Sequence, residues 1–388
     1  MGLPANLGIP FTDEQQMIAN AAREYAERRL RPGAAERDRT GAFPVEEIRG
    51  LAELGLLAMK VPTDDGGSGT DNVGYVLAMQ AIAEACASTA VILASSNLAS
   101  KILSDHASPE QKQRWLRPYA EGALGPASFA LSEPGCGSDA GALTTIARPT
   151  DDGGFSLTGQ KMWITSGAHA GIHVVFARTD GPGPDGISCF VVERGTPGLE
   201  IGKEEDKMGQ RASGTCALAF DDCRVPAANL IGRRGGGYRI AMSALGAGRV
   251  GIASLSLGLA EAAFDAAVRY ARERRAFGQV LTDFQNTQFV LADSRTELDA
   301  AWLLMLRAAR LLDAGDKAAA ETSMAKLYAS EACGRVVDRA VQLHGGYGYS
   351  REYDVERIYR DARVTRIYEG TNEIQRLVIA RELLRKYA

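Results

Sequence analysis

Apolar residues in the first third of the chain recur with the spacing of amphipathic helices. Thr12 is a suitable N-cap, because two acids follow it before an apolar run begins. Residues 75–99 are almost entirely apolar and predict one long central helix, and Pro109 stands in the tolerated first position of another. A further helix after Pro44 is predicted to bury one face, made of Val45, Ile48, Leu51, Ala52 and Leu56.

The pattern changes near Gly125, where short apolar segments begin to alternate with Gly and Pro turns such as residues 181–184 and 196–198. Five or more short strands within about 100 residues indicate a small barrel or sandwich. The strand candidates are residues 155–158, 161–165, 173–178, 187–193 and 215–220.

Helical spacing returns at Tyr238, and the segments are longer, as at 289–312 and 319–343. Asn372, with Gln375 three residues later, is predicted to cap the last helix. Its buried stripe is predicted to hold Ile374, Leu377, Val378 and Leu384.

The expected fold is therefore a multi-domain α+β structure. It has an all-helical N-terminal domain (residues 1–125), a central small β-barrel (126–236) and a C-terminal four-helix bundle (237–388).

Composition narrows the class of protein. The chain has 388 residues, of which 45% are hydrophobic and 24% charged, as in ordinary globular proteins. A net charge of -4 argues against nucleic-acid binding, although a local arginine cluster can still hold a phosphate. We see no signal peptide in residues 1–10 and no run near the ~20 apolar residues that cross a bilayer, so a cytoplasmic protein is expected.

Cysteine and histidine spacing predicts no metal site. Six cysteines are scattered without a Cys-x-x-Cys pair, which favours free thiols in a reducing compartment. Cys136 lies in a glycine-rich segment, and packing is the favoured role for it. His169 and His173 fall in a strand-like region, on one face but about 13 Å apart.

The segment 366–375 is the most informative, because it sets a single acid, Glu369, between an Ile-Tyr pair and a glycine. A carboxylate beside apolar and aromatic groups is poorly solvated, which raises its pKa and suits it to act as a general base near neutral pH. A solvated loop glutamate is the ordinary alternative.

Three other segments suit a flat, phosphate-bearing ligand. In 129–141 the glycines are spaced too widely for a dinucleotide fingerprint, but the turn lets backbone amides approach a ligand. Trp163, in 161–167, is either a ligand-stacking ring or a core residue. Arg274 at a helix end, and the glycines in 342–349, suit a diphosphate or serve only as helix C-termini.

Together, in this order, these segments resemble the acyl-CoA dehydrogenase family from about Phe11 to Tyr387. Short-chain and branched-short-chain members are most similar, through residues 86–89, 137–141 and 367–371. The resemblance implies non-covalent FAD, an acyl-CoA substrate, an electron-transferring flavoprotein as acceptor, and a homotetramer that completes the adenosine diphosphate half of the FAD site across a subunit interface.

The resemblance also assigns residues. Glu369 would remove the α-proton while the β-hydride passes to flavin, with the Glu369 amide hydrogen-bonding the thioester carbonyl. Substrate contacts are implied for Ser138, Gly246, Arg249, Tyr368 and Gly370. FAD contacts are implied for Phe129, Leu131, Ser132, Gly137, Ser138, Trp163, Ile164, Thr165, Arg274, Phe277, Phe284, Gln285, Gln342, Leu343, Gly345, Gly346, Thr371 and Glu373.

Two departures leave alternatives open. Some members place the base immediately before the arginine that is Arg249 here, where this chain has Gly248; many carry an Asp that binds the CoA arm where this chain has Gly246. A carrier-protein-bound acyl group is therefore an alternative substrate. An oxidase of the same fold is the enzymatic rival, and a non-catalytic flavin-binding scaffold is the rival of another class. A nitroalkane-oxidising relative would use Asp as its base, and Glu369 argues against it.

Overall fold

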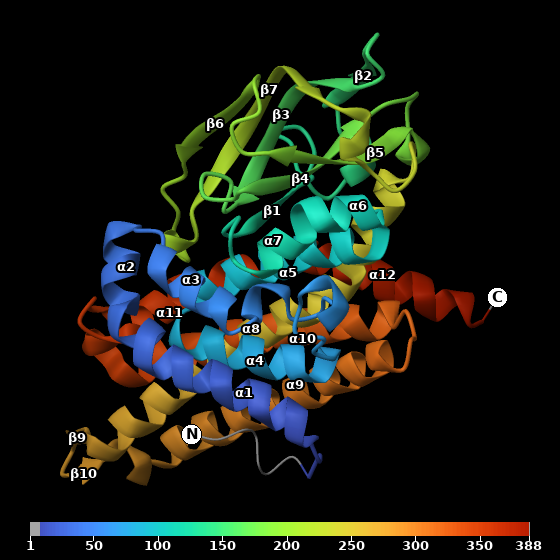
Figure 1. Cartoon of the computed structure of the whole chain (residues 1–388). Coiled ribbons are helices and arrows are strands. Elements are labelled where there is room, and N and C mark those ends of the chain that lie inside the picture. The colour runs from blue at the N-terminus through green and yellow to red at the C-terminus, as the bar shows by residue number, and fades with distance from the viewer. Residues whose placement is uncertain (1–7, 388) are drawn as a thin grey trace.

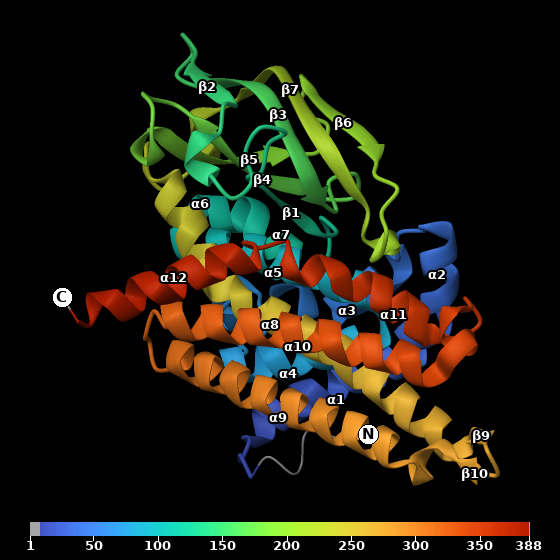
Figure 2. The same cartoon turned by 180° about the vertical axis from the view of Figure 1, so that it is seen from behind.

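The computed structural model describes residues 8–387 and has three parts. A β domain lies over a layer of N-terminal helices, and long C-terminal helices lie beneath and behind them (Figures 1 and 2). The predicted three-part architecture is confirmed. Most of the segment on which the signal-peptide prediction rests, residues 1–7, lies outside the described residues.

The N-terminal helices follow the predicted starts. Thr12 caps α1 (Asp13–Tyr25), and its side chain and that of Gln15 bond reciprocally to each other's backbone. Helix α3 (Val45–Glu53) buries Ile48, but Val45 lies on its exposed side. The other N-terminal helices are α2 (Ala34–Thr40), α6 (Pro109–Gln111) and α7 (Arg117–Ala120).

The single long helix predicted for residues 75–99 is wrong. The chain forms α4 (Asn72–Ala85) and α5 (Ala87–His106), separated at Cys86, whose backbone is extended with φ of -157°. The break redirects the chain so that both helices contact the long helix α8 (Gly237–Glu273). Apolar periodicity does not reveal the break, because the residues on both sides of Cys86 are buried.

The β domain is one sheet with strand order β6-β7-β3-β2-β4-β5-β8, and β1 (Ala127–Ala130) pairs with β4. The two strands predicted at 155–158 and 161–165 are one strand, β3 (Phe155–Thr165), because Gly159 and Gln160 continue the pairing with β7. The sheet curls around one apolar cluster, whose buried residues come from β1, β2, β3, β4, β5 and β7. The remaining strands are β2 (Ile146–Pro149), β4 (Ile172–Arg178), β5 (Ile187–Glu193), β6 (Leu199–Glu204), β7 (Thr215–Val225) and β8 (Leu230–Ile231).

The histidine pair does not share a strand. His169 lies in the turn before β4, where it stacks on Phe43 at 3.8 Å between ring centroids and lies 2.9 Å from Glu204. His173 lies within β4, buried and 2.7 Å from the hydroxyl of Ser128. Within residues 8–387, no group of three potential metal-binding side chains gathers.

The C-terminal part consists of α8, α9 (Gln285–Asp313), α10 (Ala319–His344), α11 (Asp354–Ala362) and α12 (Asn372–Arg385). Between α8 and α9 lies a hairpin of β9 (Arg275–Ala276) and β10 (Gln279–Val280). Thr371, not Asn372, caps α12, because the Thr371 side chain accepts the hydrogen bond from the Ile374 amide.

The predicted buried stripe of α12 is also corrected. Leu377 and Leu384 are 65% and 67% exposed, whereas Asn372 and Gln375 are buried. The helix runs along the outside of the bundle, and its end projects from the body of the chain (Figure 2). Leu377 and Leu384 therefore face outward and Ile374 and Val378 are only half-buried, while the polar first turn of α12 is held against α10.

Helix α8 is the one helix among the described residues that is long and apolar enough to cross a membrane. This differs from the expectation that no segment approaches that length. More than half of its apolar window is buried inside the protein, in contact with α4, α5, α9 and α10. Its hydrophobicity is that of a central core helix.

A close contact between α8 and α4 depends on a glycine. A Cβ at Gly258 would lie 2.6 Å from the Cβ of Ala83 and 2.6 Å from the carbonyl oxygen of Gln80. Both contacts are with α4 and leave no flexible atom to move aside.

We expect Gly258→Ala to lower the urea midpoint of unfolding, with a loss of about 1–3 kcal/mol from overpacking. Gly246→Ala is the matched control in the same helix, because a Cβ at Gly246 has nothing within 4 Å. Alanine should stabilise the helix there by up to about 1 kcal/mol. Equal effects of the two substitutions would contradict this account of the α4–α8 contact.

Candidate functional site

Glu369 lies on the turn that leads into α12, with a left-handed backbone at φ of 50°, and Gly370 follows at 86°. A left-handed glutamate is strained and persists only where its surroundings hold it. The Oε2 atom of Glu369 is buried and has no hydrogen-bond partner among residues 8–387. The sequence prediction of a poorly solvated acid on a turn before a helix thus agrees with the geometry.

Burial raises the pKa of Glu369 to about 7. The charges of Lys326, Lys60 and Arg249 act in the opposite direction, but none of these cations hydrogen-bonds the carboxylate. The result is a carboxyl group that is half ionised near neutral pH. A general base that works at this pH has that property.

The carboxylate lies against Gly248 of α8, two residues after Gly246. A Cβ placed on Gly248 would lie 3.0 Å from Glu369 Oε2 and 3.2 Å from Leu98 Cδ1, and one on Gly246 would meet nothing within 4 Å. Arg249 turns toward α10, where its Nη1 donates to Ser323 Oγ at 2.9 Å. Two glycines inside a long helix weaken it. Here Gly248 lets Glu369 Oε2 approach the helix closely, and Gly246 leaves open space on the same helix.

Several buried polar groups hold the Glu369 turn. Gln375 Nε2 donates to the carbonyl oxygens of Glu369 (3.3 Å) and Gly370 (2.8 Å), and Lys326 Nζ donates to the carbonyl of Gly370 at 2.9 Å. From the β domain, Gln210 Nε2 donates to the Tyr368 hydroxyl at 3.2 Å and to the Asp361 carbonyl at 3.1 Å.

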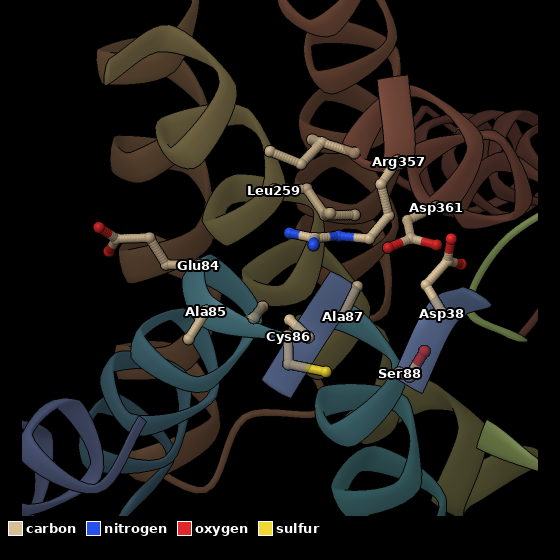
Figure 3. A pocket seen from close by; sticks show the side chains of 12 residues that line it. Asp38, Glu84, Ala85, Cys86, Ala87, Ser88, Leu259, Arg357 and Asp361 are labelled. Atoms are coloured by element: carbon tan, nitrogen blue, oxygen red, sulfur yellow. The ribbon is translucent and has the colours of Figure 1, made fainter. Parts of the chain in front are cut away.

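Asp361 connects this turn to a small polar cavity. The cavity measures about 10 Å³, which is room for one water molecule at most. Arg357 reaches across it between Glu84 on one side and Asp38 and Asp361 on the other (Figure 3). Burial raises the pKa of Asp361 to about 7. A cavity of this size holds no ligand larger than water, and it lies beside the break at Cys86.

The predicted ring-binding residues gather at one end of β3. Trp163 is 60% exposed, with φ of 63°, at a register shift between β3 and β7, so the alternative of a core tryptophan is wrong. The Met162 amide donates to the carbonyl of Ser132 at 2.9 Å, which joins the glycine-rich segment to this strand. Thr165 and Phe129 are half-buried, Gly137 and Ser138 are exposed, and Leu131 and Ile164 lie in the core.

A buried ion pair supports this surface from behind. Lys161 Nζ, fully buried, donates to Glu133 Oε1 at 2.8 Å and to the carbonyl of Leu131 at 3.1 Å. Glu133 also accepts bonds from the amides of Thr144 (2.6 Å) and Thr145 (2.9 Å). Although burial alone would raise it, Lys161 and these bonds hold the pKa of Glu133 at about 2. Cys136, in the same loop, is buried.

A second group of predicted residues lies around the β9–β10 hairpin, at the opposite end of the molecule from the β domain (Figures 1 and 2). It surrounds a cavity of about 530 Å³. Arg274 lies over the ring of Tyr347 at 5.4 Å, and Phe277 is 96% exposed. Arg274, Leu343, Gly345 and Gly346 line the cavity; Gln285 and Gln342 are exposed, and Phe284 packs edge-on to Phe277.

One chain therefore does not bring all the predicted residues together. Glu369, Tyr368, Gly370, Thr371 and Glu373 share one turn, and Gly246 and Arg249 belong to α8. Sequence reasoning missed Lys326, Lys60 and Tyr270, and it included Tyr347 only as part of the segment 342–349. The sequence pattern could have pointed to Lys326, because this lysine interrupts the otherwise small and apolar buried face of α10.

Comparison with known proteins identifies the class. The chain matches the acyl-CoA dehydrogenase N-terminal domain (residues 12–123), middle domain (128–223) and C-terminal domain (235–384). It belongs to the acyl-CoA dehydrogenase family, and it is an FAD-dependent oxidoreductase of that class.

Particular relatives are similar over nearly the whole chain. The mitochondrial short-chain specific acyl-CoA dehydrogenase of Mus musculus is 49% identical over 382 residues, covering 98% of this chain and 92% of the relative. Butyryl-CoA dehydrogenase of Megasphaera elsdenii superposes with a TM-score of 0.95 at 41% identity, covering 97% and 100%. A chain from a structure described as the electron transferring flavoprotein of Acidaminococcus fermentans has the same TM-score and identity, covering 97% and 99%.

The residues present fit FAD. Trp163 offers an exposed indole for a flat ring, and the carbonyl of Ser132 is already fixed against the same strand. Gly345 and Gly346 have nothing within 4 Å of a Cβ position, which lets backbone approach a diphosphate, and Arg274 supplies the charge.

We expect Lys161→Met to lower the thermal midpoint, because it leaves Glu133 buried without its cation, a loss of about 3–5 kcal/mol. Adding Glu133→Gln should restore part of that loss, since the stranded charge is then removed. The pair is measured by thermal unfolding of the two single variants and the double variant. If the double variant loses as much stability as the two single variants together, or more, this view of the pair is wrong.

Proposed function

We propose that Glu369 is the catalytic base and removes the α-proton of a short acyl-CoA thioester. The observation that carries this proposal is the Glu369 Oε2 atom, which is buried, without a hydrogen-bond partner in the described chain, and beside the bare surface of Gly248. Such a group has lost its water and keeps its lone pairs free for a substrate proton. The similarity to short-chain and butyryl-CoA dehydrogenases supports a short acyl group.

The turn also offers a donor for the thioester carbonyl. The backbone N–H of Glu369 has no acceptor among residues 8–387, and it lies on the same strained turn as the carboxylate. A fixed N–H at the carbonyl oxygen stabilises the negative charge that develops when the α-proton leaves. Tyr368, fixed by Gln210, keeps water from the acid.

FAD, when bound, supplies the acceptor for the β-hydride. We infer that Ser132, Trp163 and Thr165 hold its ring system and that Thr371 and Glu373 close over it. The second cluster lies at the end of the molecule opposite the β domain and contains Arg274, Phe277, Gln342 and Gly346. We therefore propose that it serves the FAD of a neighbouring copy in a homotetramer. Six free cysteines are consistent with our placement of the enzyme in the cytoplasm.

Electrons leave through an electron-transferring flavoprotein, a partner supported by the structural neighbour from Acidaminococcus fermentans. Rapid formation of peroxide with acyl-CoA would favour the oxidase instead. A protein that stays colourless after reconstitution with FAD would favour the non-catalytic scaffold.

The proposal is tested with a panel of acyl-CoAs of different length and branching, added anaerobically while bleaching of the bound flavin is followed. We expect Glu369→Gln to retain FAD and stay yellow but to reduce flavin roughly 10²- to 10⁴-fold more slowly, because the amide cannot accept the proton. The wild-type rate should rise with pH through about 7, since a base with its pKa there is protonated and inactive below it. A rate in the variant close to that of the wild type would remove Glu369 as the base.

The bare position at Gly246 tests how the thioester arm is held. We expect Gly246→Asp, which has open space for its side chain, to lower KM for acyl-CoA by about 3- to 10-fold at unchanged kcat, the gain from one added hydrogen bond. Gly246→Ala is the matched control and should change neither. If acyl-carrier protein reduces the flavin faster than acyl-CoA and Asp gives no gain, the natural substrate is the carrier-bound thioester.

A further inference from the structure

Lys326 is a fully buried lysine in the middle of α10, on the face that packs against the Glu369 turn. Taking an ammonium out of water costs several kcal/mol unless partners compensate it. Its neighbours along the buried face of α10 are small or apolar: Thr322, Ala325, Ala329, Ser330 and Cys333. The burial of a charged side chain in this position therefore calls for a functional or structural explanation.

The partners of Lys326 are neutral oxygens. Its Nζ donates to the carbonyl of Gly370 at 2.9 Å and to Asn372 Oδ1 at 2.9 Å. The other end of the Asn372 amide donates to Ser330 Oγ and Glu331 Oε1, each at 2.9 Å. Within residues 8–387 no carboxylate forms an ion pair with Lys326. Burial lowers the pKa of Lys326 to about 8, so at neutral pH the lysine is still mostly charged and that charge is directed at the turn.

Each bond has a distinct effect. The bond to Gly370 fixes the residue that follows Glu369, where two successive left-handed conformations would otherwise relax. The bond to Asn372 orders the first turn of α12 behind it. Neither bond uses Glu369 Oε2, so the carboxylate feels the charge without losing the lone pairs that a proton would occupy.

We propose that Lys326 is the positioning residue of the base: it fixes the Glu369 turn through the Gly370 carbonyl and supplies an unpaired positive charge that favours the ionised carboxylate. This inference rests on the proposed role of Glu369. A neutral donor such as glutamine would suffice to hold the turn, so the retained charge points to an electrostatic role as well.

Other groups face the same carboxylate and limit the effect. Lys60, which follows α3 and lies 4.6 Å over the Tyr75 ring, and Arg249 on α8 also favour the ionised form. Tyr75 on α4 and Tyr368 on the turn itself are neutral, with pKa values raised by burial. Loss of Lys326 therefore leaves two cations in place, and Glu369 is expected to stay protonated, and so unable to accept a proton, up to a somewhat higher pH.

The test compares Lys326→Gln, which keeps a donor but removes the charge, with Lys326→Met, which removes both. We expect the pH midpoint of flavin reduction to rise by on the order of one unit in both variants, because the positive charge no longer favours the ionised acid. The plateau rate at high pH should fall further in Lys326→Met, by roughly tenfold or more, because the turn is then released. Lys101→Gln, a surface lysine paired with Asp105, is the control and should move neither quantity.

A second readout does not depend on turnover. The carboxyl of Glu369 is titrated by infrared difference spectroscopy on the holoenzyme, and its band is assigned by its loss in Glu369→Gln. We expect its midpoint to rise in Lys326→Gln as well. If no acyl thioester reduces the flavin of the wild type, the proposed function fails, but this titration still reports on Lys326.

If Lys326→Gln does not fold, Asn372→Asp keeps the lysine and gives it a carboxylate partner in place of the amide oxygen. Neutralising the charge in this way should raise the Glu369 midpoint in the same direction. Unchanged midpoints in whichever of these variants folds, with only the plateau rate reduced, would make Lys326 purely structural and overturn the proposal.

Discussion

The buried carboxyl group of Glu369, whose Oε2 atom has no hydrogen-bond partner in the part of the chain that the structure describes, is the constraint on which this structure depends. Burying Glu369 raises its pKa to about 7, and the left-handed backbone at the same residue adds strain. Neither would persist on a free loop. The surrounding fold fixes the turn from three directions: Lys326 on α10, Gln375 on α12 and Gln210 from the β domain.

The long helices make that arrangement possible. Helix α8 brings Gly248 against the acid, and two other glycines of this helix let α4 pack closely at Gly258 and leave open space at Gly246. The break at Cys86 lets α4 and α5 both contact α8. The small cavity lined by Arg357 and Asp361 lies beside that break (Figure 3). The carbonyl of Asp361 accepts a hydrogen bond from Gln210. The same helices thus form the core and fix the position of the acid.

Much of this arrangement could be predicted from the sequence, because periodicity and caps are local. The three-part fold and the starts at Thr12 and Pro109 follow from such signals. The break at Cys86 could not be predicted, because it is imposed by α8 and has apolar residues on both sides. Strand β6 was missed because all its residues are at least partly exposed, so apolar alternation is absent. The cap at Thr371 was assigned one residue late because Asn372 is an equally good capping residue, and tertiary contacts with α10 decide between them.

The two ends of the molecule have a consequence for how cofactor sites are counted. The exposed indole of Trp163 at one end of β3 and the cavity at Arg274 beside the β9–β10 hairpin belong to one polypeptide, yet the β domain and the hairpin lie at opposite ends of the molecule (Figure 1). If each serves a different FAD, as proposed, a single subunit contains two partial FAD sites and no complete FAD site. Stoichiometry then becomes a property of the assembly, and the yellow colour of the enzyme would report on quaternary structure as directly as on folding.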